Sequence, residues 1–320
     1  MKVRVLAAGG TIAMAGSGGA QLALDAADLV AAVPGIEDPE GIESETVVNL
    51  PSAHLTLADQ LKICRAARDA ARDGIGVVVT HGTDTLEETA MLCDVVHDSD
   101  APIVFTGAIR AASAPGADGP ANLADAISVA RSEEARGMGV LVVFGGEIHH
   151  ARTARKTDTT SLTAFSSPQT GLLGRVTEGN ATFWTRVPRN RPLDPPALDH
   201  HVLVVPTTAG DDGTLARAAL ATEPDGIVIG TLGAGHLHPD LLRIWSEASE
   251  RIPVVAYCRP ERGVVLTSTY GFAGSERELR ESRIIPAAFL SPQAARMKLL
   301  ACLASGLSIE ETREAFALDD

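Results

Sequence analysis

Short apolar, β-branched runs alternate with amphipathic segments through most of the chain, and this alternation limits the fold more than any other sequence feature. Each run is apolar at consecutive positions, as expected for a parallel strand that helices cover on both faces. The alternation predicts a doubly wound α/β sheet. In the first half, the predicted strands are Val3–Ala7, Thr46–Leu50, Gly76–Thr80, Pro102–Thr106 and Gly139–Phe144, and the predicted helices are Ala26–Val33, Leu57–Asp73, Leu86–His97 and Asn122–Arg131.

The pattern is interrupted after residue 165. A β-hairpin is predicted at Gly171–Val176 and Ala181–Thr185. Residues 186–200 then contain four prolines, which fit neither a helix interior nor a central strand and indicate a semi-rigid linker. After it the alternation restarts, with predicted strands at His201–Pro206, Gly226–Gly230 and Pro253–Tyr257 and predicted helices at Leu215–Ala221, Pro239–Ser249, Pro292–Ala304 and Ile309–Ala317. We therefore predict a large N-terminal α/β domain with a mostly parallel sheet (1–185), a linker (186–200) and a smaller α/β domain (201–320).

Charge and composition exclude several classes of partner. The formal net charge is −14, and only eleven residues are aromatic (Phe 7, Trp 2, Tyr 2), which argues against nucleic acid. No stretch approaches the roughly 20 apolar residues of a membrane span, and the first apolar run is too short for a secretory signal. The cysteines are scattered without metal-ligand spacing: Cys64, Cys93, Cys258 and Cys302. We expect a soluble cytoplasmic protein.

Ligands of open α/β sheets bind beyond the carboxyl ends of the strands, and the loop after the first predicted strand carries Gly9, Gly10 and Thr11. Glycine lets the backbone turn sharply there, and the β-branch of Thr11 restricts the direction of its hydroxyl. That hydroxyl either bonds to local backbone or faces a ligand. Residues 14–20 are small and lack periodicity, which indicates either a surface linker or a mobile lid.

Two further loops carry groups that could act together. Thr83, Asp84 and Glu87 follow a predicted strand, and they could cap the next helix or favour a bound anion there. Lys156 lies in the third loop, as either a solvated cation or a partner of Thr83 and Asp84. A threonine hydroxyl needs an adjacent base for nucleophilic attack, and an amine withdrawn from water beside a carboxylate can supply it. The roles would match those of a Ser-His-Asp triad.

These segments resemble the paired signature of the bacterial-type L-asparaginases, the asparaginase/glutaminase family. The resemblance follows the chain in order through Gly9–Ala13, His81–Thr85, Gly107–Arg110, Asp118–Leu123, Lys156-Thr157 and Ser291–Arg296. It implies that L-asparagine is hydrolysed to L-aspartate and ammonia through an acyl-enzyme. Thr11 would be the primary nucleophile, and Thr83, Asp84 and Lys156 would handle protons. Backbone N–H groups near Thr83 would stabilise the oxyanion, so neither a metal nor an organic cofactor is expected.

The resemblance also implies substrate-binding residues. Ser52 would bind the α-carboxylate of the substrate, and Asp84 would also meet its α-amino group. Ala108 lies in a matching segment and is expected at the substrate as well. Glu276 and His236 fall where the family supplies residues from a neighbouring subunit. A homotetramer of two intimate dimers, with sites shared between subunits, is therefore expected.

Some positions depart from the family pattern. No tyrosine occurs at residues 13–25, where many members carry a lid tyrosine that contacts the nucleophile. Ala53 stands where glutamine is frequent, and His236 replaces a frequent asparagine. Two alternatives therefore remain beside asparagine hydrolysis: a glutaminase or other carboxamide amidase, and a non-catalytic relative that binds an amino acid.

Overall fold

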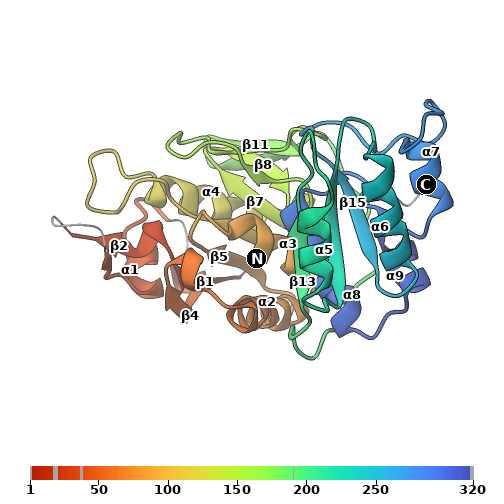
Figure 1. Ribbon diagram of the computed structural model, residues 1–320. Helices are drawn as coiled ribbons and strands as arrows, with labels where there is room; N and C mark the ends of the chain where they lie inside the picture. Colours follow the sequence, from red (N-terminus) through yellow and green to blue (C-terminus); the bar gives the residue numbers. More distant parts are fainter. Residues whose placement is uncertain (1, 17–20, 37–38, 190, 318–320) are drawn as a thin grey trace. The chain divides into compact units, whose positions relative to one another are not determined.

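The computed structural model describes residues 2–16, 21–36, 39–189 and 191–317. These residues form two compact units, Met1–Pro192 and Leu193–Asp320 (Figure 1). The division falls inside the proline-rich segment 186–200, where the ring of each proline prevents regular helix or central strand.

The first unit is built on an eight-stranded sheet in the order β12-β11-β8-β7-β6-β5-β1-β4. Neighbouring pairs from β4 to β7 are parallel, and the pairs from β7 to β12 are antiparallel. The prediction of a doubly wound, mostly parallel sheet is therefore confirmed. The strands are β1 (Val3–Gly9), β4 (Ile42–Leu50), β5 (Gly76–Thr80), β6 (Ile103–Thr106), β7 (Val140–Phe144), β8 (Glu147–His150), β11 (Gly174–Thr177) and β12 (Asn180–Phe183).

Every residue of β5, β6 and β7 is buried, because helices cover both faces of this sheet. One face packs its alternate strand residues, such as Val78 and Val104, into a core with helices α1 (Ala26–Ala31) and α4 (Gly119–Arg131). Helices α2 (Leu57–Arg72) and α3 (Leu86–Val96) pack against each other and against the sheet. Because the strands from β4 to β7 are parallel, the loops that follow them all lie at the carboxyl end of the sheet.

Two small antiparallel pairs accompany the sheet. Strand β2 (Met14–Ala15) pairs with β3 (Gln21–Leu22), and β9 (Arg155–Lys156) pairs with β10 (Phe165–Ser166). Residues 17–20 of the predicted linker or lid lie outside the described residues. The backbone N–H of Ala112 donates to the carbonyl oxygen of Met14 at 2.9 Å and connects the first pair to the loop after β6. The second pair carries a lysine whose surroundings are described below.

The second unit is a smaller α/β domain, as predicted. Its parallel strands have the order β13-β14-β15-β16, and Trp245 of helix α6 (Pro239–Ser249) is buried in its core. Across the described residues, no helix is long and apolar enough to cross a membrane. The elements are β13 (Val202–Val205), α5 (Thr214–Leu220), β14 (Gly226–Thr231), α6 (Pro239–Ser249), β15 (Val254–Cys258), α7 (Glu276–Glu281), β16 (Ile285–Pro286), α8 (Pro292–Ala304) and α9 (Ile309–Phe316).

Candidate active site

Glycines bring the loops after neighbouring strands into direct contact. A Cβ atom added at Gly10 would lie less than 3.0 Å from the backbone of Gly82, and one added at Gly82 would lie 2.6 Å from Ser52 Oγ. A Cβ added at Gly107 would lie 2.5 Å from the carbonyl oxygen of His81. Only residues without a side chain can pack this closely. The loops after β1, β4, β5 and β6 therefore share one small region of the first unit.

The change Gly10→Ala is expected to destabilise the protein by more than about 3 kcal/mol. Gly10 has φ 82° and ψ −178°, a region that costs other residues about 1–3 kcal/mol, and the added methyl would also collide with Gly82. Gly74→Ala is the matched control, because Gly74 has φ +77° but its Cβ would enter open space. Urea unfolding of both variants measures the difference. Equal losses of unfolding free energy would contradict the close packing of these loops.

Thr11 begins a short 3₁₀ turn directly after these glycines. Ile12 and Ala13 of the same turn are buried in the core and anchor it, whereas Thr11 is half-buried. Within the described residues, the Thr11 side chain forms no hydrogen bond. Its hydroxyl is thus held by a packed turn while remaining available to a ligand.

Lys156 brings together three of the residues predicted from the sequence. Its Nζ atom donates to Thr83 Oγ1 at 3.0 Å and to Asp84 Oδ1 at 2.7 Å. Thr83 is buried, the Lys156 side chain is 19% exposed, and the Asp84 side chain is 67% exposed. The amine thus reaches a buried hydroxyl and a carboxylate that solvent can also reach.

The interpretation of these polar residues as helix caps is wrong. The N-cap residue of α3 is Thr85, and its side chain makes no capping hydrogen bond but donates to the carbonyl oxygen of Ser52 at 3.1 Å. Asp84 pairs with Lys156 instead, and Glu87 Oε2 accepts from the backbone N–H of Lys156 at 2.6 Å. Sequence reasoning missed this second contact, although the three-residue spacing of Asp84 and Glu87 places them on one side of the turn.

His81 fixes the loop between β5 and α3 from inside. Burial lowers the pKa of His81 to about 4, so the ring is neutral near neutral pH. Its Nδ1 lies 2.8 Å from the carbonyl oxygen of Gly82, and its Nε2 lies 3.0 Å from Thr89 Oγ1. Because a carbonyl oxygen only accepts, we assign the proton to Nδ1, and Thr89 then donates to Nε2. The ring thereby holds the backbone that presents Thr83.

Two side chains at the start of α4, those of the N-cap residue Asp118 and of Asn122, hold the loop after β6. The buried Asp118 carboxylate accepts from the backbone N–H groups of residues 109 and 110 at 3.0 and 2.8 Å. The buried Asn122 amide donates to the carbonyl oxygen of Gly107 at 3.0 Å. Ala108, expected at the substrate, is 1% exposed in this loop. The Asp118–Leu123 segment therefore acts as a support for the neighbouring loop.

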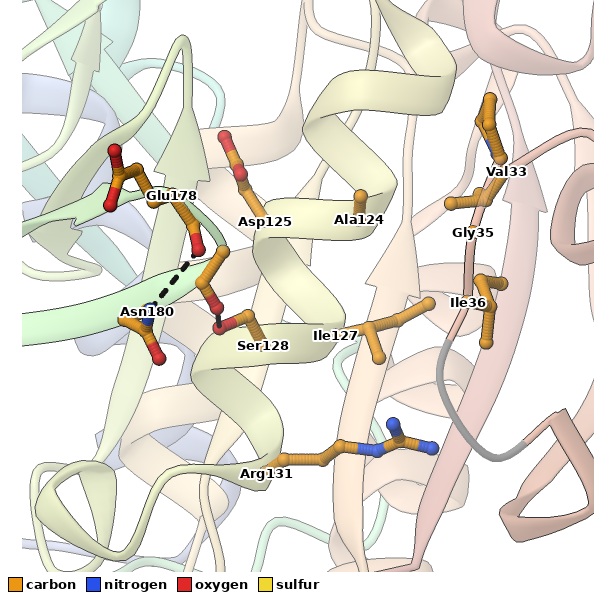
Figure 2. Close-up of a pocket in the computed structure, with 12 residues that line it drawn as sticks. Val33, Gly35, Ile36, Ala124, Asp125, Ile127, Ser128, Arg131, Glu178 and Asn180 are labelled. Atoms are coloured by element: carbon orange, nitrogen blue, oxygen red, sulfur yellow. Dashed lines mark hydrogen bonds between the residues drawn. The ribbon is translucent and has the colours of Figure 1, made fainter.

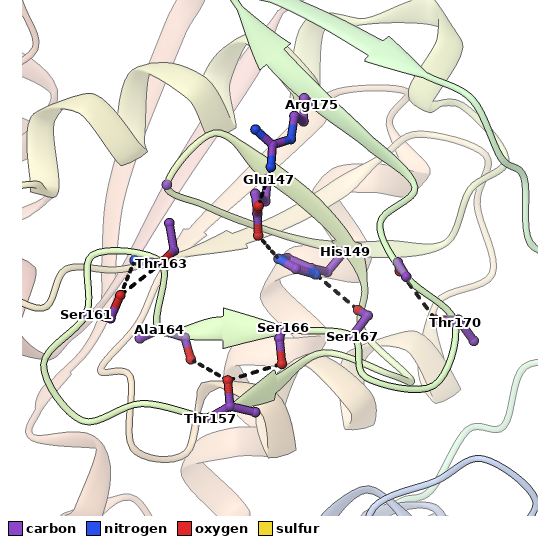
Figure 3. A network of polar contacts seen from close by, with 12 residues as sticks. Glu147, His149, Thr157, Ser161, Thr163, Ala164, Ser166, Ser167, Thr170 and Arg175 are labelled. Carbon is purple, nitrogen blue, oxygen red and sulfur yellow. Dashed lines mark hydrogen bonds and ion pairs between the residues drawn. The ribbon is translucent and has the colours of Figure 1, made fainter. Parts of the chain in front are cut away.

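Polar contacts also anchor the hairpin that carries Lys156 (Figure 3). Thr157 Oγ1 lies 3.1 Å from Ser166 Oγ across the hairpin. Further on, Ser167 Oγ lies 3.0 Å from Nδ1 of the buried His149, whose Nε2 lies 3.7 Å from Glu147 Oε2. Burial lowers the pKa of His149 to about 4, which keeps this ring neutral. The β9–β10 hairpin is thereby tied to β8.

Glu276 and His236 lie together in the second unit. Glu276 Oε1 accepts from the backbone N–H of Tyr270 at 2.7 Å, and Glu276 Oε2 lies 3.3 Å from His236 Nε2. Burial opposes ionisation of Glu276, but backbone hydrogen bonds, first that from Tyr270, hold its pKa below the ordinary value. The His236 ring contacts Tyr270 and Phe272 edge-on, with centroids 4.8 and 4.9 Å away. These two predicted residues are thus paired with each other.

A separate cavity of about 500 Å³ lies on the first unit between α4, the β11–β12 turn and residues 33–36 (Figure 2). Asp125 and Ser128 of α4 line it, and burial raises the pKa of Asp125. None of the predicted site residues is among the described residues that line it. In the described ranges, no three His, Cys, Asp or Glu side chains are grouped to hold a metal ion.

Comparisons with known proteins agree along the whole chain. The family models "Asparaginase, N-terminal" and "Glutaminase/Asparaginase C-terminal domain" match residues 2–189 and 201–316. A probable L-asparaginase of Deinococcus radiodurans is 38% identical over 288 residues (89% of this chain, 88% of that protein). An L-asparaginase of Bacillus licheniformis is 32% identical over 315 residues (95% and 96%). The crystal structure of a probable cytoplasmic L-asparaginase from Campylobacter jejuni superposes with a TM-score of 0.86 at 31% identity over 98% of both chains. The chain therefore belongs to the asparaginase/glutaminase family.

Proposed function

We propose that this protein hydrolyses the side-chain amide of L-asparagine to give L-aspartate and ammonia. The observation that carries the proposal is the Lys156 amine, held against both the Thr83 hydroxyl and the Asp84 carboxylate. Thr83 follows Gly82, which packs against the glycine that precedes Thr11. Membership of the family supports the same reaction.

In the proposed mechanism, the Thr11 oxygen attacks the side-chain carbonyl carbon and forms a tetrahedral intermediate. Backbone N–H groups near Thr83 stabilise the negative oxygen. The group formed by Thr83, Asp84 and Lys156 accepts the hydroxyl proton and passes a proton to the amide nitrogen, which leaves as ammonia when the C–N bond breaks. Water then attacks the resulting ester, releases L-aspartate and restores the threonine hydroxyl.

Substrate binding follows from the chemistry of the surrounding groups. The exposed Asp84 carboxylate is available to an α-ammonium group, and Ser52 lies beside Gly82 with a hydroxyl suited to the α-carboxylate. Ala108 follows Gly107, which packs against the loop that carries Thr83, and would contact the substrate from that position. Glu276 and His236 complete the site from a neighbouring subunit, in a homotetramer built from two dimers. The pairing of these two side chains supports a shared role.

The cytoplasm is the proposed location. The four cysteines are free thiols, and the Campylobacter jejuni structural relative is described as cytoplasmic. Free thiols without disulfides are typical of proteins in a reducing compartment. Fractionation of cells that express the protein would test this location.

Ammonia release from L-asparagine and L-glutamine, measured side by side, tests the proposed reaction. We expect a higher kcat/KM for asparagine. The alternative, a preference for glutamine, rests on Ala53, a small exposed residue next to Ser52 at a position where the family frequently carries glutamine. One methylene usually changes selectivity by only about 1–3 kcal/mol. Calorimetric binding of aspartate without release of ammonia from either amide would contradict the proposal and support a non-catalytic binding protein.

A further inference from the structure

Two carboxylates from one turn hold Lys156 at two different atoms. Asp84 lies two residues before the start of α3 and Glu87 lies in its first turn, and both side chains contact Lys156. Asp84 Oδ1 accepts from the Nζ atom of Lys156 at 2.7 Å. Glu87 Oε2 accepts from the backbone N–H of the same lysine at 2.6 Å. One contact directs the amine, and the other fixes the point from which its side chain starts.

The Glu87 contact lies at an edge that strand pairing leaves open. Strand β9 pairs with β10 on one side, where the backbone N–H of Thr157 donates to the carbonyl oxygen of Ala164 at 2.8 Å. Successive N–H groups of a strand point to opposite sides, so the N–H of Lys156 points away from β10. Glu87 supplies its acceptor.

The charge of the Glu87 carboxylate does not stabilise the fold. Burial raises the pKa of Glu87, and the hydrogen bond from Lys156 opposes that effect. The charges that face Glu87 are Glu88 on α3, which raises its pKa, and Arg155 and Lys156 on β9, which lower it. A carboxyl group with a raised pKa stabilises the fold at pH values below its ordinary pKa and loses that contribution as pH rises through the raised one. At neutral pH the folded protein is therefore less stable with Glu87 ionised than it would be with this group uncharged.

We propose that Glu87 is a positioning residue, which fixes the backbone of Lys156 so that its amine meets Thr83 and Asp84. The proposal rests on the proposed function of this cluster. If Glu87 acts in this way, kcat depends on the length of the Glu87 side chain rather than on its charge. The chain offers variants that separate these two properties at one position.

Glu87→Asp keeps the charge but withdraws the oxygen by one methylene, whereas Glu87→Gln keeps an oxygen acceptor at the same reach without the charge. We expect Glu87→Asp to lower kcat for asparagine by about 10- to 100-fold, because small displacements of a reacting group have effects of that size. KM should change by less than about threefold, since Glu87 contacts the backbone of Lys156 and would act on the reaction through that residue. Glu87→Gln should keep at least half of the wild-type kcat. Glu88→Asp and Glu88→Gln are the matched controls on the next residue of the helix, with kcat near wild type expected.

The outcomes separate this inference from the proposed function. A wild-type protein that releases no ammonia from asparagine or glutamine would contradict the proposed function and the inference with it. An active wild type whose Glu87→Asp variant keeps full kcat would overturn the inference alone. So would a Glu87→Gln variant as impaired as Glu87→Asp, because charge would then be decisive. Urea unfolding of each variant supplies a second readout: Glu87→Gln should be at least as stable as wild type at pH 7, and a clear loss would mark a structural residue.

Discussion

Replacing Thr11 by alanine is expected to lower kcat for asparagine by at least about 10⁴-fold, the effect typical of removing a nucleophile from an enzyme that forms a covalent intermediate. The fold should be retained, because Thr11 is only half-buried and its side chain forms no hydrogen bond within the described residues. Ammonia release measures kcat, and calorimetric binding of aspartate shows that the substrate site persists.

Two further variants of the same residue serve as controls. Thr11→Val keeps the β-branched shape without the hydroxyl and should be as inactive as the alanine variant. Thr11→Ser keeps the hydroxyl and should retain measurable turnover, reduced by the loss of the rotamer restriction that the β-branch provides. A Thr11→Ala or Thr11→Val variant with more than a tenth of the wild-type kcat would show that another group attacks.

Lys156→Met should lower kcat by about 10²- to 10⁴-fold, the range typical of losing a general acid or base. Methionine fills the space of the lysine stem but cannot donate to Thr83 or Asp84, so the Thr83 hydroxyl loses its only described amine neighbour. Lys62→Met is the matched control. Lys62 also donates through Nζ, to the carbonyl oxygen of Val47 at 2.9 Å, but it lies on α2 away from this cluster. We expect less than a twofold change there, and near-wild-type kcat for Lys156→Met would refute the role of the amine.

The elements that could be predicted from the sequence are those whose burial is uniform. Gly76–Thr80 is predicted and found with the same bounds, because its apolar run coincides with the five buried residues of the strand and is followed at once by polar residues and glycine. Helix Pro292–Ala304 is also found as predicted, with Ser291 as its side-chain N-cap. Strand β4 begins four residues before the predicted Thr46 because it lies at the end of the sheet. There exposed polar residues continue the pairing, as in the Arg4–Glu43 ion pair with β1, and leave no apolar signal.

The candidate site could be predicted only in part. Thr83 and Lys156 carry suitable chemistry, but they lie 73 residues apart, and composition and periodicity cannot place them in contact. The resemblance to a family linked them. Glu87 was missed because an acidic residue in the first turn of a helix is equally typical of a cap. Its partner is a backbone N–H on a two-residue strand, which is too short to show a period in the sequence.

Trapping the covalent intermediate tests the central claim most directly. The wild-type protein would be mixed with L-asparagine, quenched with acid within one turnover, and digested for peptide mapping by mass spectrometry. We predict an aspartyl ester on the peptide that contains Thr11, and no ester in the Thr11→Ala variant. An ester on Thr83 instead, or release of ammonia by the wild type with no ester on any peptide, would contradict the claim.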